Sequence, residues 1–309
     1  MAVAWITGAR GFVGRHLARH LSQQGDTVAG IGHGIWPSLE ASAWGLRYWI
    51  NGEIDAPNLE SLRRESGQPE LIYHLAGGSS VGASIASPFE DFSRTVSSTA
   101  RLLEWLRTMS PEAKVVAVSS AAVYGSGHSG PIPAGSPAQP YSPYGHHKLM
   151  MEQLCRSYAE AFDLRCIVVR LFSVYGPWLR KQLLWDLCSR LAADESPVRL
   201  GGTGAERRDW TDVRDVARLL ELATSLPGDP GEVLDGGSGI ATTVAEIATQ
   251  VVRAWGSETP IEFTGVGRAG DPFSLVADDS RLRELGFLWE IPVMHGIDRY
   301  VRWFRGERT

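Results

Sequence analysis

The chain has 309 residues, of which 43% are hydrophobic, so it can bury a large core in one big domain or in two unequal ones. Its formal net charge is -5, from 30 Lys and Arg against 35 Asp and Glu. Because no basic run is present that could bind a series of phosphates, we do not expect nucleic acid as a partner. No apolar run of about 18 residues occurs, which excludes a membrane span.

The first half of the chain alternates short apolar runs with amphipathic stretches. This rhythm is typical of repeated strand-helix units, which build a parallel sheet covered by helices on both faces. The first run follows Met1 directly, without a cationic leader or cleavage site, so we expect a cytoplasmic protein. The expected strands span residues 3–7, 27–31, 47–50, 71–75, 115–119 and 166–171, and the expected helices include 12–24 and 92–109.

The pattern changes after Gly176 and Pro177, where helices are expected at 179–191, 213–226 and 243–255. We predict a Rossmann-type doubly wound α/β fold, with a dinucleotide-binding domain at 1–176 and a smaller α/β substrate-binding lobe at 177–309. A strand near 232–237 is expected to return to the main sheet. The Gly-, Ser- and Pro-rich segment 125–143 is expected to be a loop at the carboxyl edge of the sheet, where such folds bind ligands.

A glycine-rich turn follows the first strand and leads into the first helix. Its three glycines are spaced three residues apart, which permits a tight turn, close approach of backbone N–H groups to a pyrophosphate, and close helix-strand packing. We therefore predict dinucleotide binding. The residues expected to hold the cofactor here are Gly8, Arg10, Gly11, Phe12, Val13 and Gly14.

The end of the second strand distinguishes NAD from NADP, because an acidic residue there normally binds the ribose hydroxyls of NAD. This chain has no carboxylate at that point, and Arg10 and His33 could meet a 2'-phosphate instead. The pattern slightly favours NADP. In the alternative interpretation Arg10 is a solvated loop residue and NAD binds without the acidic contact.

Tyr144 and Lys148 are four residues apart, which places a phenol and an ammonium on one face of a helix. A nearby lysine and a nicotinamide cation lower the pKa of a tyrosine, which suits proton exchange with a sugar hydroxyl. Ser120, at the end of the fifth strand, offers a hydroxyl that can bond the reacting oxygen. These three residues are the predicted catalytic group.

The chain resembles an extended short-chain dehydrogenase/reductase of the nucleotide-sugar epimerase, dehydratase and reductase group. The resemblance rests on the glycine turn, on these three residues and on the segments 74–77, 170–177, 208–210 and 268–271. The resemblance implies that Ser120 polarises the substrate oxygen, that Tyr144 is the acid/base, and that Lys148 binds the nicotinamide ribose. It further implies a nucleotide-sugar substrate and a homodimer formed through helices 92–109 and 142–162. Further expected cofactor contacts are Ile54, Leu75, Ala76 and Gly77, and the expected substrate contacts are Ser80, Ser120, Ala121, Ser173, Arg208 and Arg268.

Several positions leave alternatives open. Members that dehydrate the sugar carry an Asp-Glu pair directly after the hydroxyl residue, where this chain has Ala121 and Ala122, so chemistry at C4 of the sugar remains. A 4-keto-sugar reductase is slightly preferred, a 4-epimerase is the alternative, and a noncatalytic dinucleotide-binding sensor is a further one. Ser173 stands where the family usually has Asn. Arg208 and Arg268 could instead pair with neighbouring aspartates.

The histidines and cysteines are not expected to bind a metal. His146 and His147 are adjacent and face different ways, while His16 and His20 share a helix without an expected carboxylate partner, so we interpret all four as surface residues. The three cysteines lack CxxC spacing and are expected to be core thiols.

Overall fold

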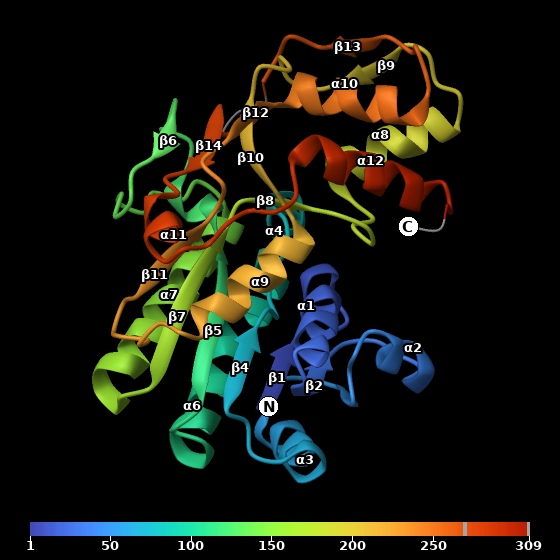
Figure 1. Ribbon diagram of the computed structural model, residues 1–309. Helices are drawn as coiled ribbons and strands as arrows, with labels where there is room; N and C mark the ends of the chain where they lie inside the picture. Colours follow the sequence, from blue (N-terminus) through green and yellow to red (C-terminus); the bar gives the residue numbers. More distant parts are fainter. Residues whose placement is uncertain (268–270, 308–309) are drawn as a thin grey trace. The chain divides into compact units, whose positions relative to one another are not determined.

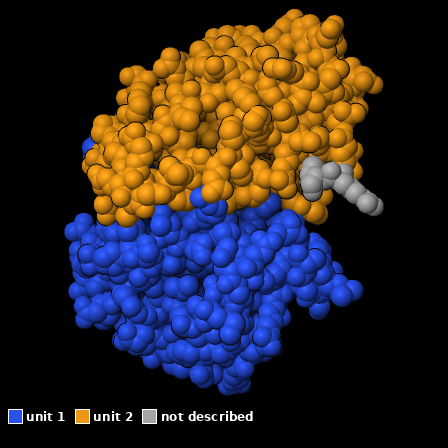
Figure 2. All heavy atoms as spheres, in the orientation of Figure 1, with its two compact units in different colours: residues 1–125, 137–171, 216–236 blue, residues 126–136, 172–215, 237–309 orange. Residues whose placement is uncertain are grey.

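The computed structural model describes residues 1–267 and 271–307. The chain divides into two compact units (Figure 2). The first unit comprises residues 1–125, 137–171 and 216–236, and the second comprises residues 126–136, 172–215 and 237–309.

The first unit is built on a seven-stranded parallel sheet with the order β11-β7-β5-β4-β1-β2-β3 (Figure 1). Chain order reverses between β1 and β4, so the loops after these two strands diverge at the carboxyl edge of the sheet. That is the place where open α/β sheets bind ligands. The strands are β1 (Val3–Thr7), β2 (Thr27–Gly32), β3 (Tyr48–Asn51), β4 (Leu71–His74), β5 (Lys114–Ser120), β7 (Arg165–Leu171) and β11 (Val233–Gly236).

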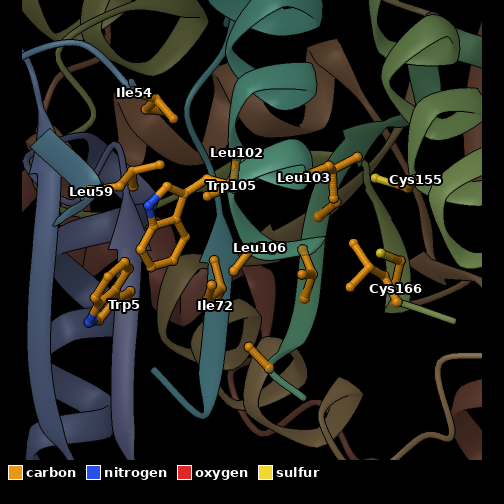
Figure 3. Close-up of a cluster of buried hydrophobic side chains, with 14 of the residues drawn as sticks. Trp5, Ile54, Leu59, Ile72, Leu102, Leu103, Trp105, Leu106, Cys155 and Cys166 are labelled. Atoms are coloured by element: carbon orange, nitrogen blue, oxygen red, sulfur yellow. The ribbon is translucent and has the colours of Figure 1, made fainter. Parts of the chain in front are cut away.

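Helices cover both faces of this sheet, which explains why the central strands are buried along nearly their whole length. One face packs against α3, α6 and α7 in a cluster that includes Trp5, Leu59, Leu103, Trp105 and Cys155 (Figure 3). The helical segments of this unit are α1 (Phe12–Gln23), α2 (Ser38–Ala43), α3 (Ala56–Ser66), α4 (Val81–Ala86), α5 (Pro88–Phe92), a π-helical turn η1 (Ser93–Ser97), α6 (Ser98–Met109), a 3-10 turn η2 (Ala121–Tyr124), α7 (Pro143–Phe162) and most of α9 (Val213–Ala223).

The second unit contains a sheet with the order β12-β10-β14-β6, on which β8 also pairs with β10, and a two-stranded sheet of β13 and β9. Its helix α10 begins with a capping box between Thr243 and Glu246, which satisfies backbone N–H groups at the helix start. The strands are β6 (Pro131–Ile132), β8 (Ser173–Tyr175), β9 (Val198–Leu200), β10 (Arg207–Asp212), β12 (Ala241–Thr243), β13 (Ile261–Phe263) and β14 (Ser274–Ala277). The helices are α8 (Gln182–Ala192), α10 (Val244–Trp255), α11 (Ser280–Glu284) and α12 (Val293–Phe304).

The predicted Rossmann-type α/β class is confirmed by the parallel sheet with its covering helices. The observed division differs from the predicted boundary at residue 176 in three places. Residues 172–176 belong to the second unit. Most of α9 belongs to the first unit, where Glu221 bonds His20 of α1 at 2.6 Å. Residues 131–132, predicted as loop, form β6 and pair with β14 of the second unit. Among the described residues, no helix is both long and apolar enough to cross a membrane.

Candidate active site

The turn between β1 and α1 has the shape of a cradle for an anion. Gly8 has a φ of +69°, which L side chains rarely adopt, and a Cβ there would stand 3.1 Å from the backbone nitrogen of Ala76. A Cβ on Gly14 would stand 2.5 Å from the carbonyl oxygen of Gly8. Gly11 is the N-cap of α1, and no side chain in the described residues caps this helix start. The turn therefore fits a dinucleotide, whose pyrophosphate oxygens would accept hydrogen bonds from the backbone N–H groups at the positive end of the helix.

The residues after β2 and β3 shape the edge of this cradle. The Arg10 guanidinium lies against Gly34, since a Cβ on that glycine would stand 2.5 Å from Arg10 Nη1. The His33 imidazole is 3.5 Å from the Glu53 carboxylate, and both side chains are exposed. Sequence analysis found the two basic residues but missed Glu53, which follows β3 rather than β2 and meets His33 only because these strands are neighbours.

The three predicted catalytic side chains come together in the first unit. Ser120 ends β5, and Tyr144 and Lys148 lie on α7, which begins at Pro143 with Ser142 as a side-chain cap. The Ser120 hydroxyl lies near the Tyr144 phenol and acts to lower its pKa. Lys148 Nζ lies 6.0 Å from the centroid of the Tyr144 ring and donates to the carbonyl of Val118 at 2.9 Å.

Burial controls the protonation of this trio. Desolvation raises the pKa of Tyr144, while the nearby Ser120 hydroxyl partly offsets that rise. Desolvation lowers the pKa of Lys148 to about 8, against the opposing effect of the carboxylates of Asp91 and Glu152. Lys148 is thus mostly charged at neutral pH, and its pKa of about 8 is close to that pH. A phenol beside such an ammonium can exchange a proton with a bound alcohol.

A buried histidine connects the glycine turn with the helices behind it. Thr99 Oγ1 donates to Thr95 O at 2.5 Å, so it must accept from His74 Nε2, 2.8 Å away. His74 Nδ1 therefore accepts from Thr7 Oγ1 at 2.8 Å, and that oxygen in turn accepts from the Ala76 N–H at 3.1 Å. This chain of bonds fixes one tautomer of His74 and joins the two loops at the reversal point of the sheet. Burial, with Lys148 nearby, lowers the pKa of His74 to about 3.

Two histidines that were predicted to lie on the surface are largely buried, His147 and His20. The His147 ring is only 12% exposed, and its Nδ1 is 2.6 Å from the buried carboxylate of Asp91 on α5. His20 is bonded to Glu221, so it has the carboxylate partner that the sequence did not reveal. In both cases the partner comes from a segment distant in the chain, which helical spacing alone cannot show.

Comparison with known proteins identifies the group to which this arrangement belongs. Residues 4–234 match the NAD dependent epimerase/dehydratase family. The chain belongs to this family. It is 27% identical to a UDP-glucose 4-epimerase of Azospirillum brasilense over 96% of this chain and 89% of the relative. The structure of Bacillus cereus UDP-glucuronic acid 4-epimerase, in complex with UDP-glucuronic acid and NAD, superimposes with a TM-score of 0.87 at 26% identity, covering 98% of this chain and 99% of that one. The Thermotoga maritima UDP-glucose 4-epimerase with UDP-glucose gives a TM-score of 0.87 at 25% identity, with coverage of 98% and 99%.

Membership of the NAD dependent epimerase/dehydratase family confirms the predicted resemblance and shows that the protein is an enzyme of this family. The comparisons favour the epimerase alternative over the preferred reductase, and they give the preference for NADP no support, since NAD is bound in the Bacillus cereus structure.

The other predicted cofactor contacts lie near the reversal point of the sheet or in the core. Leu75, Ala76 and Gly77 follow β4, and a Cβ on Gly77 would stand 3.2 Å from Lys148 Nζ, so this loop adjoins the catalytic trio. Ile54 follows β3, and its side chain belongs to the buried hydrophobic cluster. Phe12 and Val13, at the start of α1, are partly exposed.

The predicted substrate contacts are divided between the units. In the first unit, Ser80 caps α4 by accepting from Ala83 N, and Ala121 is buried in η2. In the second unit, Ser173 begins β8, and Arg208 on β10 donates to the carbonyl of Arg207 at 2.8 Å. Arg268 lies outside the described residues.

The aspartates considered as alternative partners of Arg208 are engaged elsewhere. Asp209 accepts from Ser238 and from the backbone N–H groups of Gly239 and Ala277. Asp212 forms a bidentate pair with Arg214, with distances of 2.8 and 2.7 Å. The substrate role of Arg208 stays a prediction.

Proposed function

We propose that the protein is an NAD-dependent 4-epimerase of a UDP-linked sugar. The observation that carries the proposal is the phenol of Tyr144, which lies near the Ser120 hydroxyl and near the buried ammonium of Lys148, in the unit that also holds the glycine cradle. A 4-epimerase needs one acid/base that can serve the C4 oxygen in both directions, and a single phenol with a nearby cation supplies that function.

The residues of the chain have distinct roles in this reaction. Gly8, Gly11 and the N-terminus of α1 would hold the pyrophosphate. When bound, NAD supplies a hydride acceptor and a positive charge that lowers the pKa of the phenol. Tyr144 removes the proton from the C4 hydroxyl of the sugar and returns it to the C4 oxygen on the reverse step. Ser120 donates a hydrogen bond to that oxygen, and the ammonium of Lys148 places a positive charge near the phenol.

Two observations support epimerisation over the other reactions of this group. Ala121 and Ala122 stand where sugar dehydratases carry their acid pair, and both are buried, so these two positions supply neither a general acid nor a base. A reductase would release its cofactor in each cycle and was preferred because of Arg10 and His33. The Glu53 carboxylate beside His33 opposes binding of a 2'-phosphate there and favours NAD.

We also propose a homodimer formed through α6 and α7. Both helices expose large apolar side chains, namely Met109 on α6 and Met150 and Phe162 on α7. Burying them against a second copy would remove apolar surface from water. Light scattering of the purified protein tests this proposal, and a monomer at all concentrations would reject it.

The decisive experiment has two parts. Purified protein is denatured and the released dinucleotide identified, and native protein with added NAD is incubated with UDP-glucose, UDP-galactose or UDP-glucuronic acid while the C4 epimer is followed by NMR. We expect NAD and a C4 epimer of at least one sugar. Stoichiometric consumption of NADPH with a 4-keto sugar would instead establish a reductase, and binding without turnover would establish a sensor.

A further inference from the structure

Arg170 is the centre of a buried polar network beside the catalytic trio. It lies on β7, with Ser119 of β5 and Asp235 of β11 as its direct neighbours across the sheet. Its guanidinium forms a bidentate ion pair with Glu152 of α7, at 2.9 and 2.6 Å, and both side chains are at most 10% exposed. The guanidinium carbon is also 4.7 Å from the ring centroid of Tyr124.

The partners of this ion pair are the immediate neighbours of catalytic residues. Ser119 Oγ donates to Glu152 Oε1 at 2.5 Å, and Ser119 directly precedes Ser120. Glu152 lies one helical turn beyond Lys148 on the same face of α7.

A second branch holds the turn that follows Ser120. Ser120 is the N-cap of η2, and η2 ends at Tyr124, whose hydroxyl donates to both carboxylate oxygens of Asp235 at 2.8 Å. One guanidinium therefore contacts groups on the helix that carries Tyr144 and on the turn that Ser120 begins.

We propose that Arg170 and Glu152 are positioning residues that hold the Ser120 strand end and the Tyr144–Lys148 face of α7 in catalytic register. A planar fork paired with a carboxylate fixes distance and orientation together, which a lysine in the same place cannot do. Displacement of a catalytic group by about 1 Å can lower a rate by about 100-fold, so a rigid connection between the two elements has a direct effect on turnover. The inference rests on the proposed epimerase function.

The charge of Glu152 gives the network a second effect on Lys148. The titratable groups that face Lys148 are His74 from β4, Asp91 from α5, and Tyr144, Glu152 and Cys155 from its own helix. Asp91 and Glu152 oppose the fall in the pKa of Lys148 that burial causes. Removal of the Glu152 charge therefore lowers this pKa below about 8, and the neutral amine forms at lower pH.

The test compares Glu152→Gln and Arg170→Lys with wild-type protein and with Glu160→Gln. Glu160 forms an exposed ion pair with Arg156 on the same helix and is the matched control. We expect kcat for epimerisation to fall about 100-fold in the first two variants. KM and the Kd for NAD should stay within about threefold, because neither residue belongs to the cradle. In Glu152→Gln the alkaline limb of the pH profile should also move to lower pH, while Glu160→Gln behaves as wild type.

Variants that bind NAD normally and retain wild-type kcat and pH profile would overturn the inference, even if they melt at lower temperature, since the pair would then serve only stability. If neither variant folds, Ser119→Ala removes a single hydroxyl, and an unchanged kcat in that variant would overturn the inference equally. If wild-type protein epimerises no UDP-sugar, the proposed function fails. The charge effect of Glu152 is then judged by NMR titration of Lys148, whose midpoint must be lower in Glu152→Gln than in wild type.

Discussion

His74 provides a quantitative test of how the cofactor turn is held. Its imidazole is buried and neutral, accepts from Thr7 at Nδ1 and donates to Thr99 at Nε2. Protonation would place a second donor opposite the Thr7 hydroxyl, which already accepts from Ala76, and would bury a cation near Lys148. Acid should therefore destabilise the fold through this one residue.

The size of the effect follows from the shift in pKa from 6.5 to about 3. Because the folded state binds the proton more weakly than the unfolded chain, this contribution to stability is complete above about pH 6.5 and decreases as the pH falls towards 3. At about pH 4.5, two units below the unfolded value, the loss is roughly 2 to 3 kcal/mol.

Urea unfolding at a series of pH values, followed by tryptophan fluorescence, measures this slope. We expect the free energy of unfolding of His74→Asn to depend on pH less steeply than that of wild type, by roughly 2 to 3 kcal/mol between pH 7 and about 4.5. His146→Asn, at an exposed position of α7, is the control and should follow wild type. Equal slopes for wild type and His74→Asn would refute the buried, neutral state of His74.

Three further predictions concern catalysis and the cofactor. Gly14→Ala places a Cβ 2.5 Å from the Gly8 carbonyl oxygen and should weaken NAD binding by about 1 to 3 kcal/mol, as measured by calorimetry. Gly82→Ala is the control, because its Cβ meets nothing within 4 Å, and it should leave the affinity for NAD unchanged. Equal affinities of the two variants would contradict the role of the cradle. Tyr144→Phe should lower kcat by about 100-fold or more with nearly unchanged NAD affinity, and a fully active variant would remove this phenol from the mechanism. The kcat of wild-type protein should fall as the pH rises through about 8, because Lys148 is charged below its pKa and neutral above it. A kcat that does not change over this pH range would show that the charge is not required.

The chemistry-bearing residues of the first unit could be predicted because their signals are local. Glycines three residues apart after an apolar run, and a tyrosine and lysine one helical turn apart, describe geometry that neighbouring residues create by themselves. Ser120 was found because it ends a predicted strand. The structure brings all three candidates together, with Lys148 Nζ 6.0 Å from the Tyr144 ring centroid and the Ser120 hydroxyl near the phenol.

The tertiary structure decided which distant groups meet these residues. Glu152 pairs with Arg170 across 18 positions, His147 with Asp91 across 56, and His20 with Glu221 across 201. No spacing rule connects such pairs, because they depend on the order of strands in the sheet and on the helices that pack against it. For the same reason the sequence misplaced His147 and His20 on the surface and missed the carboxylate of Glu53 beside His33.

The sequence by itself therefore determined the class of fold, and it predicted the glycine cradle and the candidate catalytic trio, because these follow from periodicity and short-range spacing. The burial that lowers the pKa of Lys148 to about 8 and that of His74 to about 3 exists only after the strands and helices have assembled. Desolvation and long-range ion pairs are properties of the packed molecule, so the electrostatics of the site was decided by the tertiary structure.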